Sequence, residues 1–283
     1  MLILKILSEN KTEKSGCLAE HGLSIYIETE EKTLLFDLGQ SDIFIQNAKR
    51  VKADLTKVDA VIVSHAHFDH TQGMPSFCQI NGTAPIYIQN EAFGRRYHLG
   101  EKGPRGENIG ILWTKQQLEE FSGRLRLTEE PVFITPNIAV SGTMDRDPGF
   151  IPTEKFVVYD EHADYHEDNM AHEQILVIRQ PEGLYIFSGC SHLGVIAAIR
   201  QANKLFPAHR IAGLIAGMHL YQTEEGKREA IIEEVLSYTP DFLLPLHCTG
   251  MAAICRIRSL IGERCILAGA GDVIDCQKTR TAL

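Results

Sequence analysis

The sequence predicts an α/β protein in which two strand-rich halves pack face to face, with helices on the outside. One observation is that short apolar runs rich in β-branched residues alternate with amphipathic segments along the chain. The other is that histidines directly follow several of these runs, which brings them together if the strand ends meet at one edge of a sheet. No repeat of solenoid length and no low-complexity linker divides the 283 residues, so we expect a single domain, 1–283.

The composition excludes several kinds of partner. A chain of 283 residues that is 44% hydrophobic and 23% charged can bury a substantial core. Its formal net charge of −9 argues against a nucleic-acid-binding surface. No run approaches the roughly 20 apolar residues of a membrane span. We therefore expect neither nucleic acid nor membrane as a partner, and the sequence leaves the oligomeric state open.

The first residues and the cysteines indicate the compartment. Residues 1–7 are apolar but too short for a signal peptide, and charged residues follow at once. The seven cysteines are scattered and form no C-x-x-C pair, which is typical of reduced thiols in a chain without an export signal. We therefore expect a cytoplasmic protein.

Apolar runs and helical signals set out the elements in order. In the first half we expect strands at 2–7, 23–28, 33–36, 59–63, 85–88 and 133–141, with helices at 41–49 and from 71 to 78. In the second half we expect a hairpin of strands 174–179 and 184–188, further strands at 211–216, 242–246 and 266–269, and helices at 195–205, 223–237 and from 250 to about 260.

The run 59–63 ends in a dense group of metal-binding side chains. His65, His67, Asp69 and His70 follow it within a few residues, at H-x-H-x-D-H spacing. Neutral imidazole and carboxylate are good ligands for Zn²⁺, Mn²⁺ or Fe²⁺, and Mg²⁺ is a further candidate. A solvated polar loop is the alternative, but four ligand-type residues at this spacing are far more specific than one histidine. We expect His65 and His67 to face one ion and Asp69 and His70 a neighbouring one.

Further candidates lie at other strand ends. His192, His219 and His247 each follow a predicted strand, and together with the turn they predict one convergent site. We assign His192 and His247 to metal and His219 to metal or substrate. His21 is a candidate too, although a lone histidine at a loop end is more often an ordinary loop residue. Residues 160–173 are best interpreted as a polar loop, from which one of three residues could reach the metals: His166, Asp168 or His172.

The segment 90–150 gives weak helix and strand signals. It is rich in glycine and basic residues within an acidic protein, and it holds the single tryptophan, Trp113. Such a segment can be an insertion that covers a site and binds an anion; a solvated surface excursion is an equally good interpretation. Under the first interpretation, Arg95 and Arg96 are candidate substrate-binding residues.

Five stretches of the sequence resemble the metallo-β-lactamase superfamily, and in particular its branch of archaeal dihydropterin–ribofuranosylaminobenzene phosphate synthases and their bacterial relatives. The resemblance implies an αββα sandwich of two mixed sheets with helices outside. It also implies that Asp37, at the end of a strand, supports the histidine turn rather than binding metal. The five stretches are Glu20-His21-Gly22-Leu23-Ser24, Phe36-Asp37-Leu38-Gly39-Gln40, Ser64-His65-Ala66-His67-Phe68-Asp69-His70, Gly189-Cys190-Ser191-His192 and Pro245-Leu246-His247-Cys248-Thr249-Gly250.

The chain departs from the superfamily pattern at two positions. The usual pattern has a further histidine shortly before the 174–179 strand and a bridging aspartate after the following strand. Here Cys190 takes the bridging position, and no T-x-x-G-H motif precedes it. We expect Cys190 and His192 to replace both missing residues. A thiolate ligand favours a softer ion such as Zn²⁺.

The resemblance implies a metal-dependent enzyme that acts on a phosphorylated or otherwise anionic small molecule. In a hydrolase, a divalent ion lowers the pKa of water from about 16 to about 7. We expect His65, His67 and His247 to hold one ion and Asp69, His70 and His192 the other, with Asp69 and His70 also acting in catalysis. The alternative is the synthase itself, a condensation that releases pyrophosphate.

An alternative of another class is a metal-binding sensor or redox protein that performs no hydrolysis. The superfamily includes di-iron members with a fused flavin domain, and the absence of a flavin-binding extension makes this alternative weaker. Metal analysis and a visible spectrum distinguish the two classes. A colourless zinc protein favours the enzyme, and bound iron with visible absorbance favours the redox protein.

Overall fold

A seven-stranded mixed sheet forms one half of the protein. The computed structural model describes residues 1–160, 162 and 164–281. The strand order in this sheet is β17-β1-β2-β3-β4-β5-β8. The neighbours β17, β1, β2 and β3 pair antiparallel, whereas β3, β4, β5 and β8 pair parallel. Their bounds are β1 Leu2–Ser8, β2 Ser24–Thr29, β3 Thr33–Phe36, β4 Ala60–Ile62, β5 Ile86–Gln89, β8 Leu125–Thr128 and β17 Val273–Asp275.

A six-stranded sheet forms the other half, in the order β16-β15-β14-β13-β10-β9. Strands β14, β15 and β16 run parallel to one another, while β14, β13, β10 and β9 are joined antiparallel. The carboxyl ends of three neighbouring strands therefore lie at the same edge. The bounds are β9 Val132–Thr135, β10 Ile138–Val140, β13 Leu176–Gln180, β14 Gly183–Ser188, β15 Ile211–Gly217 and β16 Phe242–Leu246.

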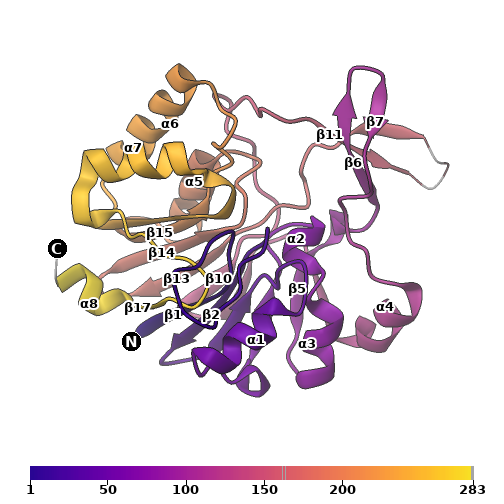
Figure 1. Cartoon of the computed structure of the whole chain (residues 1–283), viewed down its shortest axis with the longest axis horizontal. Coiled ribbons are helices and arrows are strands. Elements are labelled where there is room, and N and C mark those ends of the chain that lie inside the picture. The colour runs from indigo at the N-terminus through magenta and orange to yellow at the C-terminus, as the bar shows by residue number, and fades with distance from the viewer. Residues whose placement is uncertain (161, 163, 282–283) are drawn as a thin grey trace.

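The two sheets face each other, and helices cover their outer faces, so the predicted αββα sandwich is confirmed (Figure 1). The seven-stranded sheet is covered by α1 Ile43–Arg50, α3 Met74–Ile80 and α4 Lys115–Phe121. The six-stranded sheet is covered by α5 Val195–Leu205, α6 Glu225–Ser237 and α7 Met251–Ile261. Two short helices are α2 Phe68–Thr71, inside the histidine turn, and α8 Cys276–Thr281, at the end of the described chain. None of the helices in the described part of the chain has the length and apolar character needed to span a bilayer.

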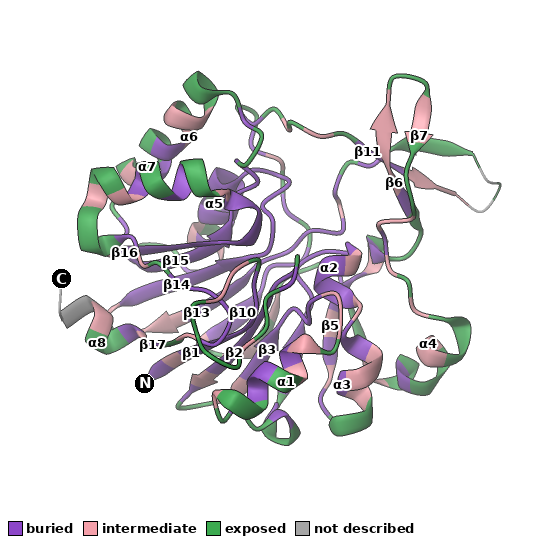
Figure 2. Ribbon diagram, viewed as in Figure 1, coloured by how far each residue is buried: buried purple, intermediate pink, exposed green. Residues whose placement is uncertain are grey.

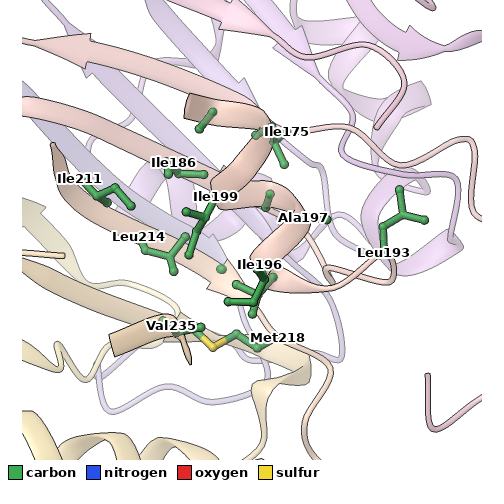
Figure 3. Close-up of a cluster of buried hydrophobic side chains, with 14 of the residues drawn as sticks. Ile175, Ile186, Leu193, Ile196, Ala197, Ile199, Ile211, Leu214, Met218 and Val235 are labelled. Atoms are coloured by element: carbon green, nitrogen blue, oxygen red, sulfur yellow. The ribbon is translucent and has the colours of Figure 1, made fainter. Parts of the chain in front are cut away.

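The pleat of each strand divides the core into three layers. Leu34 and Phe36 on β3 point between the sheets, whereas Leu35 points to the helices outside, because successive strand residues face opposite sides. Buried strands accordingly fill the centre of the molecule, while the exposed residues gather on the outer helix faces and loops (Figure 2). On α5, Ile196 and Ile199 pack against Leu214 of β15, which joins the helix layer to the sheet (Figure 3). Both sheet faces are thus dry, and the polar site is confined to one edge.

A third, four-stranded sheet stands apart from the sandwich and was not predicted. Its order is β12-β11-β6-β7, with β6 Arg95–Gly100, β7 Gly103–Arg105, β11 Phe156–Tyr159 and β12 Tyr165–Glu167, and all its neighbours pair antiparallel. It rises from one end of the molecule (Figure 1). Most of its residues are partly exposed, so it lacks the apolar runs by which strands are recognised in a sequence. We call this sheet the lid.

The predicted strand at 266–269 is wrong. Cys265 forms a single bridge to Leu243, and the N–H of Ile266 donates to the Leu243 carbonyl at 2.8 Å, after which the chain leaves the six-stranded sheet. Gly269 then fits closely against Lys11, where an added Cβ would lie 2.5 Å from a backbone oxygen. The chain instead reaches the opposite sheet and pairs as β17 with β1.

Candidate metal centre and active-site cavity

The histidine turn after β4 is held by Asp37 at the end of β3. The Asp37 carboxylate accepts the Ser64 N–H and the Ser64 hydroxyl, each at 2.7 Å, and the Nδ1 of His70 lies 2.7 Å from the same carboxylate. All three residues are fully buried. An ionised carboxylate can only accept hydrogen bonds, so these contacts fix which atoms carry protons.

The hydrogen bonds to Asp37 turn ring nitrogens toward the centre. His70 donates through Nδ1, and its Nε2 faces the centre; burial alone would lower the pKa of this ring, but Asp69 and Asp37 outweigh it and raise that pKa. The Ser64 hydroxyl donates to Asp37 and therefore accepts from Nδ1 of His65, 2.9 Å away, which leaves a lone pair on His65 Nε2. A ring nitrogen fixed in this way by its partner is typical of metal-binding histidines.

His192 lies over the first half of the turn. Its ring centre is 5.0 Å from that of His65 and 4.8 Å from that of His67. The Nε2 atoms of all three rings are buried, and none has a hydrogen-bond partner within the described residues. Burial lowers the pKa of each imidazole well below its usual value, so the rings are neutral and can donate lone pairs.

His247 lies over the second half of the turn. Its Nε2 is 3.3 Å from Nε2 of His70 and 3.2 Å from Oδ2 of Asp69. Its Nδ1 donates to Oδ1 of Asn10 at 2.8 Å, so its Nε2 points a lone pair at Nε2 of His70. Burial alone would raise the pKa of Asp69, but His70, His21 and His247 outweigh it and hold that pKa well below its usual value.

The predicted division of ligands between two ions is therefore wrong in its geometry. We expected His247 beside His65 and His67, and His192 beside Asp69 and His70; the structure places them the other way round. The spacing within the turn cannot specify which later strand end lies above which half of it. Whether these residues bind metal stays a prediction.

Cys190 lies between the two groups. Its sulfur is 3.3 Å from His70 Nε2, and its potential ligand atom lies within 4.8 Å of those of His65 and His192 on one side and of His70 and His247 on the other. Burial raises the pKa of the thiol well above its usual value. A bound metal ion would lower the pKa of this thiol. The structure thus places Cys190 between the two groups, and its bridging of two metal ions stays a prediction.

The donor set fits one or two divalent ions. Imidazole nitrogens that have no hydrogen-bond partner among the described residues converge with a carboxylate and a thiol in a buried space. A cation would satisfy these lone pairs, whereas a purely structural cluster would satisfy them with hydrogen bonds. Mixed imidazole and sulfur ligands favour Zn²⁺ among the common ions.

Two buried glutamates position the distant histidines. Glu173 accepts the backbone N–H groups of His192 and Leu193, each at 2.7 Å. Glu9 accepts those of His247 and Lys11, also at 2.7 Å. Burial raises the pKa of Glu173 to about 7, although the two N–H groups favour its ionised form.

Sequence reasoning missed both glutamates and Asn10. Glu9 and Asn10 directly follow β1, which is the signal that could have revealed them, because polar residues at a strand end pointed to the site elsewhere in the chain.

The other candidates from the sequence lie at different distances from this centre. His21 sits at the rim: its Nε2 is 3.2 Å from Asp69 Oδ2, and its side chain is 60% exposed. His166 is exposed on β12 of the lid. His172 instead braces the turn, since its Nδ1 accepts the Ala66 N–H at 3.0 Å and its Nε2 lies 3.3 Å from Asp168.

The assignment of Arg95 and Arg96 to substrate is wrong. Arg96 is buried and donates to Asp168 and to the backbone oxygens of Ala92 and Glu91. Its guanidinium is therefore hydrogen-bonded within the protein and does not face a substrate. Arg95 is exposed, does not line the cavity and lies over the ring of Tyr159. Successive side chains of β6 face opposite sides, which leaves Arg95 exposed and buries Arg96 beside Asp168. Neither the strand nor this ion pair can be recognised in the sequence.

A cavity of about 820 Å³ opens above the two groups of ligands. On one side it is lined by the turn and the strand ends, and on the other by lid residues, among them His98 and Arg105. No carboxylate of the described residues forms an ion pair with Arg105. Glu154 accepts hydrogen bonds from His219 Nε2 at 3.0 Å and from the Tyr221 hydroxyl at 2.9 Å. The lid therefore contributes charge to the cavity through residues other than the two arginines predicted.

Four residues around the centre have left-handed backbone conformations. The φ angles of Asp37, Ser191, His219 and His247 are 57°, 57°, 48° and 49°. Side chains with a Cβ rarely adopt this region. Each of these residues follows a strand, and the conformation turns the chain sharply as it leaves the sheet.

The chain belongs to the metallo-β-lactamase superfamily, whose family model matches residues 19–162. Members of this superfamily are mostly enzymes and generally bind divalent metal ions. The chain is 29% identical to an uncharacterized protein of Methanocaldococcus jannaschii, over 91% of this chain and 94% of that protein. It is 28% identical to the 7,8-dihydropterin-6-methyl-4-(beta-D-ribofuranosyl)-aminobenzene-5'-phosphate synthase of the same organism, over 83% of each.

Among solved structures, the chain is similar to Tm1679, a metal-dependent hydrolase of the beta-lactamase superfamily. The TM-score is 0.81 at 26% sequence identity, and the match covers 97% of this chain and 99% of that one. The resemblance inferred from the five stretches is thus confirmed for the superfamily and for a relative in the synthase branch.

Proposed function

We propose that this protein is a metal-dependent hydrolase acting on a phosphorylated or otherwise anionic small molecule, with Zn²⁺ as its metal. The observation that carries the proposal is the pair of buried donor groups at the base of a cavity. In one, three imidazole nitrogens lack hydrogen-bond partners among the described residues; in the other, the Nε2 atoms of His70 and His247 face each other at 3.3 Å. Similarity to a metal-dependent hydrolase supports the same class of reaction.

The residues fall into distinct tasks. His65, His67 and His192 would hold one ion, Asp69, His70 and His247 the other, and Cys190 both. When bound, such an ion supplies Lewis-acid chemistry, polarising an ester or phosphoryl oxygen and making water more acidic. The carboxylate of Asp69 lines the cavity and can hold a proton on its way to the leaving group. His70, fixed by Asp37, keeps that carboxylate ionised.

Arg105 supports an anionic substrate. It lies opposite its cross-strand partner His98 in the lid, and both line the cavity. A guanidinium without a protein partner is suited to bidentate binding of phosphate or carboxylate. Phe156 and Ile109 form apolar parts of the same wall and would limit the access of bulk water to the reacting group.

Assays with the zinc-loaded protein test the reaction class. We expect turnover of a generic phosphodiester or lactone that is lost after treatment with a chelator and restored by Zn²⁺. Arg105→Ala should raise KM for the anionic phosphodiester about tenfold, since one charge-assisted contact contributes roughly 1.5 kcal/mol or more. The control Arg95→Ala, changed on the same lid but outside the cavity, should leave KM unchanged. Absence of turnover with every phosphodiester and lactone tested would contradict the proposal.

The synthase is the second candidate, because a relative 28% identical over 83% of the chain carries that name. A condensation must exclude water and seat two aromatic substrates, and the lid and the apolar wall offer such a surface. Incubation with the pterin pyrophosphate and its aminobenzene partner tests it. Release of pyrophosphate in this mixture, with no hydrolysis of the generic substrates, would reverse our order of preference.

A further inference from the structure

Three neighbouring parallel strands place a ligand-type side chain at the same position beyond their ends. Cys190, His219 and Cys248 are each the second residue after a strand, namely β14, β15 and β16. The registers pair Ser188 with Ala216 and Gly217 with Leu246, so the three strand ends are nearly level. Side chains two residues further on therefore meet above the sheet edge, outside the two groups of ligands already described except for Cys190.

The three side chains are close together and buried. Their potential ligand atoms all lie within 4.8 Å of one another, and the residues are only 3%, 7% and 5% exposed. The backbone N–H of His219 donates to the Cys248 sulfur at 3.3 Å. Gly217 makes room for that sulfur, since a Cβ there would lie 2.8 Å from it.

Glu154 orients the His219 ring. The Nε2 of His219 donates to Oε2 of Glu154 at 3.0 Å, and the Tyr221 hydroxyl donates to the same oxygen at 2.9 Å. The opposite ring nitrogen, Nδ1, is buried and has no hydrogen-bond partner among the described residues. A histidine that donates one N–H to a carboxylate and leaves its other nitrogen bare has the arrangement of a metal ligand.

We propose that Cys190, His219 and Cys248 form a binding site for a soft divalent ion such as Zn²⁺ or Cd²⁺, beside the two histidine-rich groups and sharing Cys190 with them. Two thiolates and one imidazole are ligands that select such ions. All three residues line the cavity, so a fourth position stays open to water or substrate, as in metal sites with three protein ligands. Both cysteines bind such an ion as thiolates.

This proposal concerns metal binding alone, so its test needs no assay of the reaction proposed above. The arrangement has one competing explanation within the protein: an ion pair of a protonated His219 with a Cys248 thiolate. Burial alone would lower the pKa of His219, but the Cys248 sulfur and the Glu154 carboxylate raise it to about 10. The two explanations differ in what Cd²⁺ does.

Titration with Cd²⁺, followed by thiolate-to-metal absorbance and native mass spectrometry, tests the site. Cys248→Ser should bind one ion fewer per chain than the unaltered protein, and its absorbance at saturation should fall to about half, because one of two thiolate ligands is lost. The matched control is Cys255→Ser on α7, an exposed cysteine, which should change neither quantity. Circular dichroism checks that each variant is folded.

Two more variants keep the test decisive if Cys248→Ser fails to fold. His219→Gln should also bind one ion fewer, while Glu154→Gln should retain the ion with an affinity about tenfold lower, as is usual for a partner that orients a ligand. The same number of ions and the same absorbance in Cys248→Ser as in the unaltered protein would overturn the proposal in favour of the ion pair. Equal stoichiometry in a folded His219→Gln would do so as well.

Discussion

The turn after β4 and the ends of β14 and β16 supply the same kinds of side chain to one centre in opposite ways. The turn delivers His65, His67, Asp69 and His70 within six residues, and Asp37, which lies 27 residues before Ser64, fixes the start of the turn and the ring of His70. The strand ends deliver one ligand-type histidine each, and these histidines are far apart in sequence. The first region is a local motif, whereas the second exists only when the sheet is formed.

The two regions are also held in different ways. In the turn, buried side chains hold both main chain and side chains: Asp37 accepts the Ser64 N–H, the Ser64 hydroxyl and the Nδ1–H of His70, and His172 accepts the Ala66 N–H. At the strand ends, the glutamates Glu173 and Glu9 hold only the backbone of His192 and His247. The comparison teaches that both regions depend on buried residues distant in sequence, and that the two glutamates position their histidines through the main chain.

The largest expected effect comes from removing one ligand on each side of the comparison. His67→Ala should lose most of the bound metal and remain folded, since the core strands do not depend on this ring. His247→Ala should empty the group of Asp69 and His70 and leave the other group filled. Metal content per chain and thermal melting measure both outcomes. Full metal occupancy in His67→Ala would refute the assignment of the turn.

Asp37→Ala should have the next largest effect. It leaves the buried Ser64 N–H and His70 Nδ1 without their acceptor, and hydrogen bonds to a charged group contribute about 1.5–3 kcal/mol each. We expect the free energy of unfolding to fall by about 4 kcal/mol, measured by urea denaturation. Asp59→Ala is the control, since the Asp59 carboxylate also accepts a backbone N–H, that of Thr33, but is exposed, and it should cost less than about 1 kcal/mol. Equal losses in the two variants would show that the turn does not depend on Asp37.

Asp168 connects the lid to the histidine turn, so a change at this residue tests whether the turn depends on that connection. It joins Arg96 of the lid to His172, which accepts the Ala66 N–H. Burial opposes ionisation of Asp168, but His172 and Arg96 outweigh it and lower its pKa. Because the folded pKa lies below the unfolded value of about 3.9, the unfolded chain binds the extra proton. The stabilisation is therefore complete above about pH 5 and is lost as the pH falls through the folded pKa.

Asp168→Asn should accordingly lower the free energy of unfolding by about 2 kcal/mol at pH 7 and by much less at pH 2. Urea denaturation at the two pH values measures the difference. The same loss at both pH values would mean that the charge of Asp168 contributes nothing, and that only its shape and hydrogen bonding matter.

The smallest expected effects come from the two glutamates. Each oxygen of Glu9 and Glu173 accepts one backbone N–H. In a glutamine, the side-chain NH₂ group would replace one of these oxygens and would face a backbone N–H, with no acceptor between the two donors. Glu173→Gln and Glu9→Gln should each weaken metal affinity about tenfold, measured by competition with a chelator. Glu30→Gln, changed at an exposed residue, should leave the affinity unchanged. An effect as large as that of His67→Ala would show that the backbone contact matters as much as a ligand.

The sequence predicted the sandwich and the turn because both leave local signals. Alternation and β-branched runs marked the buried strands, and β16 was predicted with the bounds that the structure gives. The lid strands lacked such a signal, since they are half-exposed. Residues 266–269 have the apolar character of a strand, but they do not pair with the neighbouring strand β16. Only Cys265 forms a bridge to β16, at Leu243, and no continuous ladder follows.

The sequence predicted several residues of the site, but it did not predict how they are arranged relative to one another. His192 and His247 were recognised by their place after strands, yet which of them meets His65 depends on the order β16-β15-β14, and the spacing of residues does not contain that order. The role of Arg96 depended on Asp168, more than 70 residues away. Glu9 and Glu173 act through backbone groups, which have no side-chain pattern to detect.

The left-handed conformations of Asp37, Ser191, His219 and His247 have a consequence for evolution and design. At each position a glycine would relieve the backbone, by roughly 1 kcal/mol. A sequence optimised only to fit this backbone would therefore place glycine at these positions, and the redesigned protein would be more stable and chemically inert. Selection for stability and selection for activity thus favour different residues at these four positions. Lys52, Met170, Ala208 and Thr239 share the same conformation, so a disagreement between the residue that the backbone prefers and the residue that is present marks the working part of the molecule only where such residues also converge in space.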